Sequence, residues 1–339
     1  MVLAPSPSSD NGVMIETRGL TKRFGDLIAV DRVDLEIRKG EIFGLLGPNG
    51  AGKTTTISML ITIRPITEGK ALVNGFDVAR QPAKVRASCG IVFQEPSIDT
   101  TLTARENLEL HARLYGVPKS IRTERIEELL ALVDLKDRED SLVKTFSGGM
   151  KRRLEIARGL LHHPPIIFLD EPTLGLDPQT RQHIWDYIER LRREMRTTFV
   201  LTTHYMEEAD RLCDRIGIID HGKIVALGTP KELKDSLGGD TVVLTMDDPP
   251  LDAFRALPFV SKVDVRDRAV WLSVERATSN LARIIQAAGG REIGTVEVRR
   301  PTLEDVFIRL TGRAIRQAEE GGGEGWSGQV MQYTASTNR

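Results

Sequence analysis

Two short segments carry the residue types that phosphate chemistry requires. The first reads Gly47-Pro48-Asn49-Gly50-Ala51-Gly52-Lys53-Thr54 and matches the pattern G-x-x-x-x-G-K-[ST]. Glycines let backbone N–H groups turn toward phosphate oxygens, and a following helix adds its positive N-terminal end. Lys53 is expected to reach the β- and γ-phosphates, and the Thr54 hydroxyl to hold Mg²⁺. This segment therefore predicts a nucleoside triphosphate site.

The alternative for this first segment is a glycine-rich turn that fits the pattern by chance. Amino-acid frequencies give such a match in on the order of one chain in a hundred. Here an apolar stretch that is typical of a buried strand, Glu41–Leu46, precedes the loop, and a predicted helix, Thr54–Ile63, follows it. Because a phosphate loop needs this context, the functional interpretation is favoured.

The second segment is an apolar stretch, residues 166–169, that ends in the carboxylates Asp170 and Glu171. Phosphoryl transfer needs a metal ion to neutralise charge and a group to orient the attacking water. Asp170 suits the Mg²⁺ shell, and Glu171 suits the polarisation of water. A helix cap or a turn is the structural alternative, and the phosphate loop decides between the two in favour of function.

A third motif, Ser147-Gly148-Gly149, stands at the start of a predicted helix. By itself it would be a serine cap followed by two flexible glycines. Its position between the phosphate loop and the acidic strand end changes this interpretation, because the order of the three motifs resembles the nucleotide-binding domain of the ATP-binding cassette (ABC) transporter family. The resemblance covers about residues 13–238 and identifies Ser147-Gly148-Gly149 as the family's signature.

The resemblance implies roles for further residues, with ATP and Mg²⁺ as the ligands. Phe24 occupies the aromatic position that stacks on adenine, and Thr55 completes the phosphate-binding set. Gln94 corresponds to the Q-loop glutamine, which senses Mg²⁺ or the attacking water and links to the membrane partner. Asp177 lies in the D-loop, and His204 corresponds to the switch histidine that contacts the γ-phosphate. Glu171, His204 and Gln94 are thus the expected catalytic residues, and Thr54, Gln94 and Asp170 the expected metal site.

Each of these residues alone would have an ordinary structural explanation. Phe24 would be a partly buried core aromatic, and Gln94 a solvated loop residue. Asp177 could cap the helix that follows it, and His204 could be a hydrogen-bonded histidine at the end of a strand. Only the collective order of the motifs supports the functional roles.

The resemblance also implies partners. In this family two domains pair head to tail, with ATP between the phosphate loop of one and the signature of the other. A second copy of the chain is therefore expected, together with an integral-membrane permease. The signature departs from the commonest family form at Phe146 and Met150. With residues 151–153 and the ending Arg300–Phe307, these positions resemble the daunorubicin and drug-resistance exporter branch, whose permease is of the ABC-2 type.

Composition limits the other functions. Lys and Arg total 47 against 48 Asp and Glu, a net charge of −1, which argues against wide coverage of nucleic acid. The only cysteines, Cys89 and Cys213, belong to no metal-ligand spacing and suggest reduced thiols. No apolar stretch approaches the length that crosses a bilayer. The chain is therefore expected to start in the cytoplasm, and the family resemblance implies that it binds peripherally at the cytoplasmic face of the inner membrane.

Strands that alternate with helices predict an α/β fold with a largely parallel sheet. The family resemblance implies that this is a P-loop NTPase fold with a helical insert. A second pattern, strand–helix–strand–strand–helix–strand, predicts a small ferredoxin-like α+β domain. The expected organisation is a disordered leader at residues 1–12, the nucleotide-binding domain at 13–238, the accessory domain at 239–312 and a flexible tail at 313–339.

The predicted function is ATP hydrolysis that drives export through a separate permease. The alternatives are a soluble ABC ATPase that acts on ribosomes or DNA, a regulatory module that binds ATP without useful turnover, and a P-loop kinase. A single cassette without sustained heptads disfavours the first alternative. Glu171 and His204 disfavour the second, and the signature disfavours the third. The sequence does not identify the cargo.

Overall fold

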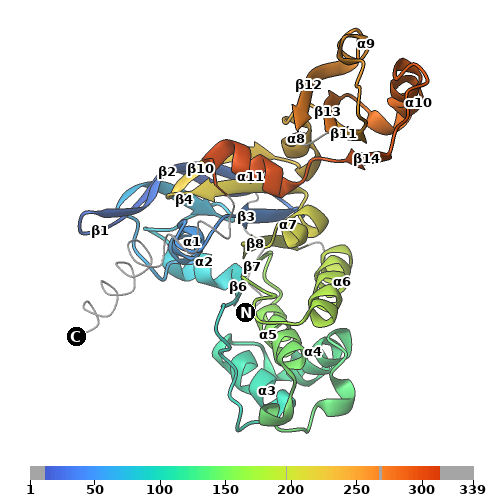
Figure 1. Cartoon of the computed structure of the whole chain (residues 1–339). Helices are drawn as coiled ribbons and strands as arrows, with labels where there is room; N and C mark the ends of the chain where they lie inside the picture. The colour runs from blue at the N-terminus through green and yellow to red at the C-terminus, as the bar shows by residue number, and fades with distance from the viewer. Residues whose placement is uncertain (1–11, 196, 267–268, 314–339) are drawn as a thin grey trace. The chain divides into compact units, whose positions relative to one another are not determined.

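The computed structural model describes residues 12–195, 197–266 and 269–313, and these form two compact units (Figure 1). The first unit ends at Leu227 and the second begins at Gly228. Apart from residues 12 and 313, the predicted leader and tail lie outside the described residues. The two units are described separately below.

The first unit is built on a six-stranded sheet with the order β10-β9-β3-β8-β7-β6. The strand pairs β9–β3, β3–β8, β8–β7 and β7–β6 are parallel. Strands that are buried on both faces need apolar residues at successive positions, and β3, β7 and β8 are buried along their whole length. The strands are β3 (Ile42–Leu46), β6 (Cys89–Val92), β7 (Ile166–Asp170), β8 (Thr198–Thr203), β9 (Arg215–Asp220) and β10 (Lys223–Gly228).

A second, four-stranded sheet of the first unit has the order β2-β1-β4-β5. Its strands are β1 (Val13–Phe24), β2 (Leu27–Arg38), β4 (Glu68–Val73) and β5 (Phe76–Asp77), and neighbouring strands run antiparallel. The sequence predicted only the first part of β1 and the last part of β2. Register shifts at several points along this hairpin interrupt the alternation of apolar and polar residues, so the full strands were not evident.

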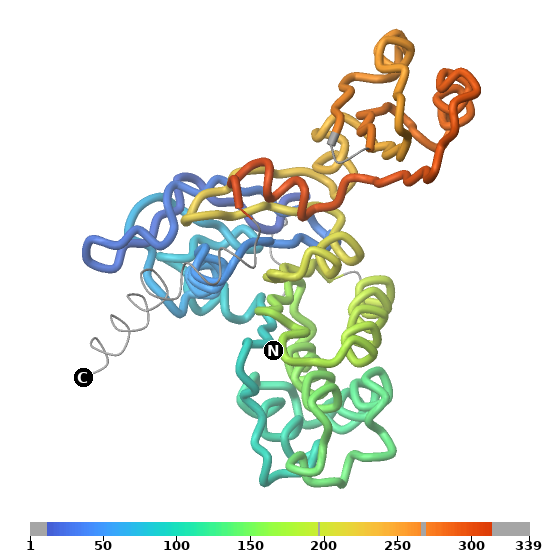
Figure 2. The backbone as a smooth tube through the Cα atoms, viewed as in Figure 1, coloured from blue at the N-terminus to red at the C-terminus, as the bar shows by residue number. Residues whose placement is uncertain are grey.

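Helices cover the parallel sheet, and three of them form the predicted insert. Figure 2 shows α3, α4 and α5 as one cluster in which each helix contacts the other two. Helix α5 packs so close to β6 that a Cβ atom on Gly90 would lie 2.2 Å from the carbonyl oxygen of Gly159. The helices of this unit are α1 (Lys53–Leu60), α2 (Pro82–Ala87), α3 (Ala104–Leu114), α4 (Lys119–Leu132), α5 (Gly148–Leu160), α6 (Pro178–Met195) and α7 (Met206–Leu212), with short 3₁₀ turns at Lys136–Arg138 and Val143–Thr145.

The second unit has the predicted β-α-β-β-α-β order. Its sheet has the order β14-β11-β13-β12, all antiparallel, which is the ferredoxin-like arrangement. Its core contains Val242, Leu244, Phe254, Leu272 and Ile284. The elements are α8 (Pro230–Asp235), β11 (Asp240–Thr245), α9 (Leu251–Arg255), β12 (Val260–Arg266), β13 (Ala269–Val274), α10 (Ala277–Ala287), β14 (Thr295–Arg299) and α11 (Leu303–Thr311).

The second unit begins about ten residues before the boundary that the sequence suggested at residue 238. Helix α8 packs against α11, and the Arg309 guanidinium donates a hydrogen bond of 3.2 Å to the carbonyl oxygen of Leu237. A capping box formed by Thr229 and Glu232 starts α8. The segment that precedes the two glycines therefore belongs to the second unit.

Both cysteines are free and buried in the first unit. Burial raises the pKa of the Cys89 thiol to about 12 and raises the pKa of the Cys213 thiol as well. Among the described residues, no helix is both long and apolar enough to cross a membrane.

We expect both thiols of the native protein to resist an aromatic disulfide reagent at pH 8. A pKa of about 12 leaves roughly one Cys89 in 10,000 as thiolate at that pH, and the thiolate is the reactive species. Absorbance of the released thiol should show no fast phase in buffer and two equivalents per chain in denaturant. A fast equivalent from the native protein would contradict the burial of these side chains.

Candidate active site

The phosphate loop joins β3 to α1, and close backbone contacts explain why two of its positions are glycine. A Cβ atom on Gly47 would lie 2.2 Å from the carbonyl oxygen of Ile219. Gly52 has φ 105°, and a Cβ atom there would lie 2.5 Å from the carbonyl oxygen of Ala29. Helix α1 starts without a side-chain cap and without an acidic residue in its first turn. The loop thus presents backbone and a helix N-terminus to an anion, which is the arrangement that binds phosphate.

Lys53 lies at the centre of the site. Its side chain is buried, and its ammonium group donates to the carbonyl oxygens of Gly47 at 2.8 Å and Pro48 at 3.1 Å. The same nitrogen lies 3.1 Å from Glu171 Oε1. A buried ammonium group needs compensating partners, and these three acceptors supply them.

Asp170 stands at the end of β7, between two hydroxyl groups. Thr54 Oγ1 donates to Asp170 Oδ1 at 3.1 Å, and Thr202 Oγ1 on the neighbouring strand β8 donates to the same oxygen. Burial raises the pKa of the Asp170 carboxyl, and the charge of Glu171 raises it further, while the two hydroxyl hydrogen bonds lower it. A carboxylate beside a threonine hydroxyl offers the oxygen ligands that Mg²⁺ prefers.

Glu171 follows Asp170 with a backbone φ of 48°, a conformation that side chains other than glycine seldom adopt. Its N–H donates to the carbonyl oxygen of Thr202 at 3.2 Å and to Thr202 Oγ1 at 3.0 Å. Its Oε2 lies 2.8 Å from His204 Nδ1. Burial alone would raise the pKa of the Glu171 carboxyl, but the hydrogen bond with His204 and the charge of Lys53 bring it below its usual value. Glu171 is therefore held as a carboxylate.

The topology explains why these residues meet. Strands β3, β8 and β7 are neighbours and parallel, so their carboxyl ends lie at one edge of the sheet. The phosphate loop follows β3, His204 follows β8, and Asp170 and Glu171 lie at the end of β7. Ligands of open α/β sheets bind at this edge.

The protein supplies only part of a Mg²⁺ coordination shell at this site. Among the described residues, no group of three or more His, Cys, Asp or Glu side chains could hold a metal ion. Mg²⁺ is commonly bound by one or two carboxylates together with substrate phosphates and water. Asp170 and Thr54, next to the phosphate loop, fit such a shared ion.

Three other predicted residues lie outside this cluster. Phe24 is half-buried at the end of β1, with the Lys22 ammonium 5.1 Å and the Arg64 guanidinium 5.3 Å from the centre of its ring. Gln94 is exposed just after β6. Asp177 accepts from the Thr180 N–H at 3.0 Å and from its hydroxyl at 2.6 Å, so it binds the first turn of α6, as the structural alternative proposed.

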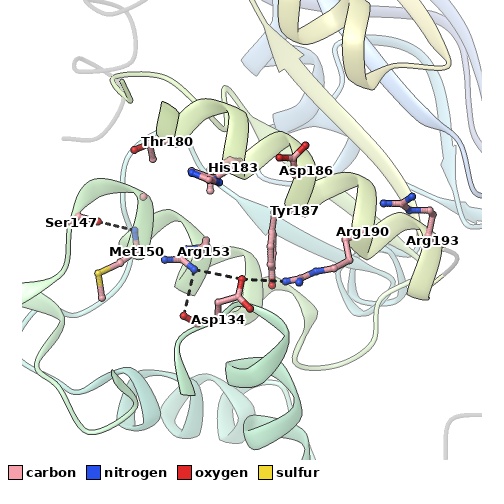
Figure 3. A pocket seen from close by; sticks show the side chains of 12 residues that line it. Asp134, Ser147, Met150, Arg153, Thr180, His183, Asp186, Tyr187, Arg190 and Arg193 are labelled. Carbon is pink, nitrogen blue, oxygen red and sulfur yellow. Dashed lines mark hydrogen bonds and ion pairs between the residues drawn. The ribbon is translucent and has the colours of Figure 1, made fainter. Parts of the chain in front are cut away.

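The signature residues also lie apart from the phosphate loop. Ser147 caps α5 by accepting from the Met150 N–H at 3.3 Å, and a Cβ atom on Gly149 would lie 2.4 Å from the Thr180 methyl group. Ser147 and Gly149 line a pocket of about 490 Å³ between α5 and α6, where Arg153 and Arg190 contact Asp134 (Figure 3). This pocket does not include Lys53 or the residues around it.

Sequence reasoning missed Thr202 and the cations beside Phe24. Thr202 is fully buried in β8 and contacts both Asp170 and Glu171. A run of threonines just before His204 was the available signal. Lys22 precedes Phe24 by two residues in one strand, a spacing that places both side chains on the same face, whereas Arg64 is distant in sequence and had no such signal.

Comparisons with known proteins place both units of the chain in known families. Residues 30–174 match the ABC transporter family, and residues 228–311 match the C-terminal domain of DrrA1-3-like ATP-binding proteins. Together with the two relatives described next, these matches show that the chain belongs to the ABC transporter family and is an ATPase subunit with a DrrA-like C-terminal domain.

Two curated relatives align over most of the chain. The linearmycin resistance ATP-binding protein LnrL of Bacillus subtilis (strain 168) is 40% identical and covers 89% of this chain and 100% of that protein. The daunorubicin resistance ATP-binding protein DrrA2 of Streptomyces coeruleorubidus is 40% identical and covers 91% of this chain and 98% of that protein.

A solved structure shares the fold of the first unit. The ATP-binding cassette MJ0796, a dimer in a post-hydrolysis state bound to ADP and Pi, is 29% identical with a TM-score of 0.58. The match covers 64% of this chain and 98% of that one. The predicted P-loop NTPase fold is thus confirmed.

We expect Glu171→Gln to lower the free energy of unfolding of the nucleotide-free protein by about 2 kcal/mol at pH 7, since it removes a buried charge that is bonded to Lys53 and His204. The folded pKa lies below the unfolded value, so this stabilisation is present above about pH 4.5 and is lost as the pH falls through the folded pKa. Urea unfolding should give a constant difference from pH 7 to 5 and a smaller one below that range.

The exposed Glu124 on α4 provides the control for this measurement. Glu124→Gln should change the free energy of unfolding by less than about 0.5 kcal/mol at every pH. A Glu171→Gln effect as small as the control's would mean that the ion pair with Lys53 contributes nothing to stability.

Proposed function

We propose that this chain is the ATP-hydrolysing subunit of an exporter and that it works as a head-to-tail homodimer on a separate integral-membrane permease. The observation that carries the proposal is the Glu171 carboxylate, held between Lys53 and His204 beside the Asp170–Thr54 pair. This is the arrangement that phosphoryl transfer to water needs, because it combines cationic, metal-binding and water-orienting groups.

In this proposal the predicted residues have the following roles. The backbone of residues 47–54, with Thr55, binds the phosphates, and the Phe24 ring takes the adenine. Asp170, Thr54 and Gln94 hold Mg²⁺, which when bound neutralises charge on the phosphates. Glu171 accepts a proton from the attacking water, and His204 holds the Glu171 carboxylate and meets the γ-phosphate.

The separation of the two motifs supports a dimer. Ser147 and Gly149 line a pocket that excludes Lys53, so one chain offers a phosphate loop and a signature that do not form a single site. Pairing two chains head to tail would place each signature, with Asp177, opposite the partner's phosphate loop. The dimeric cassette bound to ADP and Pi among the structural relatives supports this arrangement.

The relatives support export through a partner. LnrL and DrrA2 are named resistance ATP-binding proteins for linearmycin and daunorubicin. By analogy, a permease of the ABC-2 type would carry the cargo, and this chain would bind peripherally at the cytoplasmic face of the inner membrane. The favoured cargo class is a drug or an antibiotic. No role on ribosomes or nucleic acid is proposed.

We expect Glu171→Gln to lower ATP turnover by about 100-fold or more, as loss of a general base does, while ATP binding is kept. ATP with Mg²⁺ should then trap a closed dimer, which size-exclusion chromatography would detect. Lys53→Ala provides the control, because it should lose ATP binding and form no trapped dimer. Turnover by Glu171→Gln at the wild-type rate would refute the role of this carboxylate.

The transport function is tested by purifying the tagged full chain from detergent-solubilised membranes of its host, followed by mass spectrometry. A multi-spanning permease in equal amount with the chain is the expected result, and its sequence would narrow the cargo class. Recovery with ribosomes or nucleic acid and without a permease would refute export and leave the ATPase chemistry in place.

A further inference from the structure

Arg152 is a buried arginine on α5, five residues after Ser147. A guanidinium group has five N–H donors in a rigid fork. In this structure each of the five has an acceptor. They are the carbonyl oxygens of Pro172 (2.7 Å), Phe93 (2.6 Å), Asp170 (3.1 Å) and Glu171 (3.0 Å) and the carboxylate of Glu155 (3.0 Å).

Three of these acceptors belong to the strand end that carries the catalytic carboxylate. Glu171 has a positive φ of 48°, which costs free energy unless neighbouring contacts hold it. Its N–H is held by Thr202 on one side, and its carbonyl oxygen is held by Arg152 on the other. The two contacts together fix the peptide units from which the Glu171 side chain projects toward Lys53 and His204.

The other acceptors connect α5 to the segment around Gln94. Arg152 binds the carbonyl oxygen of Phe93, directly before Gln94. Glu155 Oε1 accepts from the Ser97 N–H at 2.8 Å, and the buried Arg158 donates to the Ser97 carbonyl oxygen at 2.8 Å. Residues 93 and 97 are thus both anchored to α5, and Gln94 lies between the anchors.

A buried ion pair is weak evidence for stability, because desolvation of both charges offsets their attraction. Arg152 and Glu155 are almost fully buried, and most of the arginine's donors go to backbone acceptors on two separate segments. Filling the core alone would need no such set of five directed bonds. The arrangement suits a group that fixes the relative position of those segments.

We propose that Arg152 is a positioning residue for ATP hydrolysis, which holds the Glu171 backbone in its left-handed conformation and ties it, through α5, to the segment that carries Gln94. This inference rests on the proposed role of Glu171. It adds that the signature helix, the segment around Gln94 and the catalytic strand end are connected by one guanidinium group. Arg152 touches neither nucleotide nor water in this role.

The first test uses steady-state ATP hydrolysis by the full chain. Arg152→Gln should lower kcat by about 10- to 100-fold, since a displacement of the order of 1 Å of a catalytic group has that effect. The KM for ATP should change by less than about threefold, because the phosphate loop is untouched. Arg152→Lys should recover part of kcat, since it keeps the charge and three of the donors.

The second test separates positioning of Glu171 from general loss of structure. If Arg152 acts through Glu171, the double variant Arg152→Gln, Glu171→Gln should turn over ATP no more slowly than Glu171→Gln alone. The proposal would be overturned if the two single-variant losses in kcat multiplied in the double variant. It would also be overturned if Arg152→Gln raised the KM for ATP and left kcat unchanged. If Arg152→Gln does not fold, the same cycle with Arg152→Lys decides the question by the same criteria.

Arg125 provides a matched control. Its guanidinium donates to the backbone carbonyl oxygen of Leu161, just after α5, at 3.2 Å. This bond involves neither the Glu171 strand end nor the segment around Gln94. Arg125→Gln should leave kcat within about twofold of the wild type. The single Glu171→Gln variant tests the proposed function separately. Normal ATP turnover by Glu171→Gln would refute the role of Glu171. If Glu171→Gln loses turnover but Arg152→Gln keeps the wild-type kcat, only the inference about Arg152 is refuted.

Discussion

The buried ion pair between Lys53 and Glu171 is the constraint on which the rest of the site depends. A charge at such depth is tolerated only with partners around it. Lys53 comes from the start of α1, after the loop that follows β3, and Glu171 comes from the end of β7. The parallel order β3-β8-β7 is what brings the phosphate loop and the acidic strand end together. In the strand between them, Thr202 accepts a hydrogen bond from the Glu171 N–H, and His204, just after that strand, hydrogen-bonds the Glu171 carboxylate and helps to keep it ionised.

The sequence predicted the parts of this site that follow from local patterns. Fully apolar runs predict buried parallel strands, and glycines at fixed offsets predict a phosphate loop, because both depend on neighbouring residues only. The roles assigned to Phe24, Gln94, Asp177 and the signature depended on the order of motifs. They stay predictions until the variants are measured.

What the sequence did not predict depends on contacts between distant residues. The five acceptors of Arg152 come from three segments, and no spacing links them. Register shifts hid most of the β1–β2 hairpin. The start of the second unit was placed too late, because the pair Gly238-Gly239 looked like a linker. The capping signal at Thr229 and Glu232 was present in the sequence, but only the packing of α8 on α11 shows where that helix belongs.

The early start of the second unit defines the portable module of this chain. An independent fold carries its own core and caps, and here that set begins at Gly228, where the match to the DrrA1-3-like C-terminal domain also begins. A chimaera that exchanged only the part after residue 238 would separate α8 from α11 and leave half of a helix pair on each side of the junction. Recombination between relatives would therefore be tolerated better just before Gly228 than at the paired glycines.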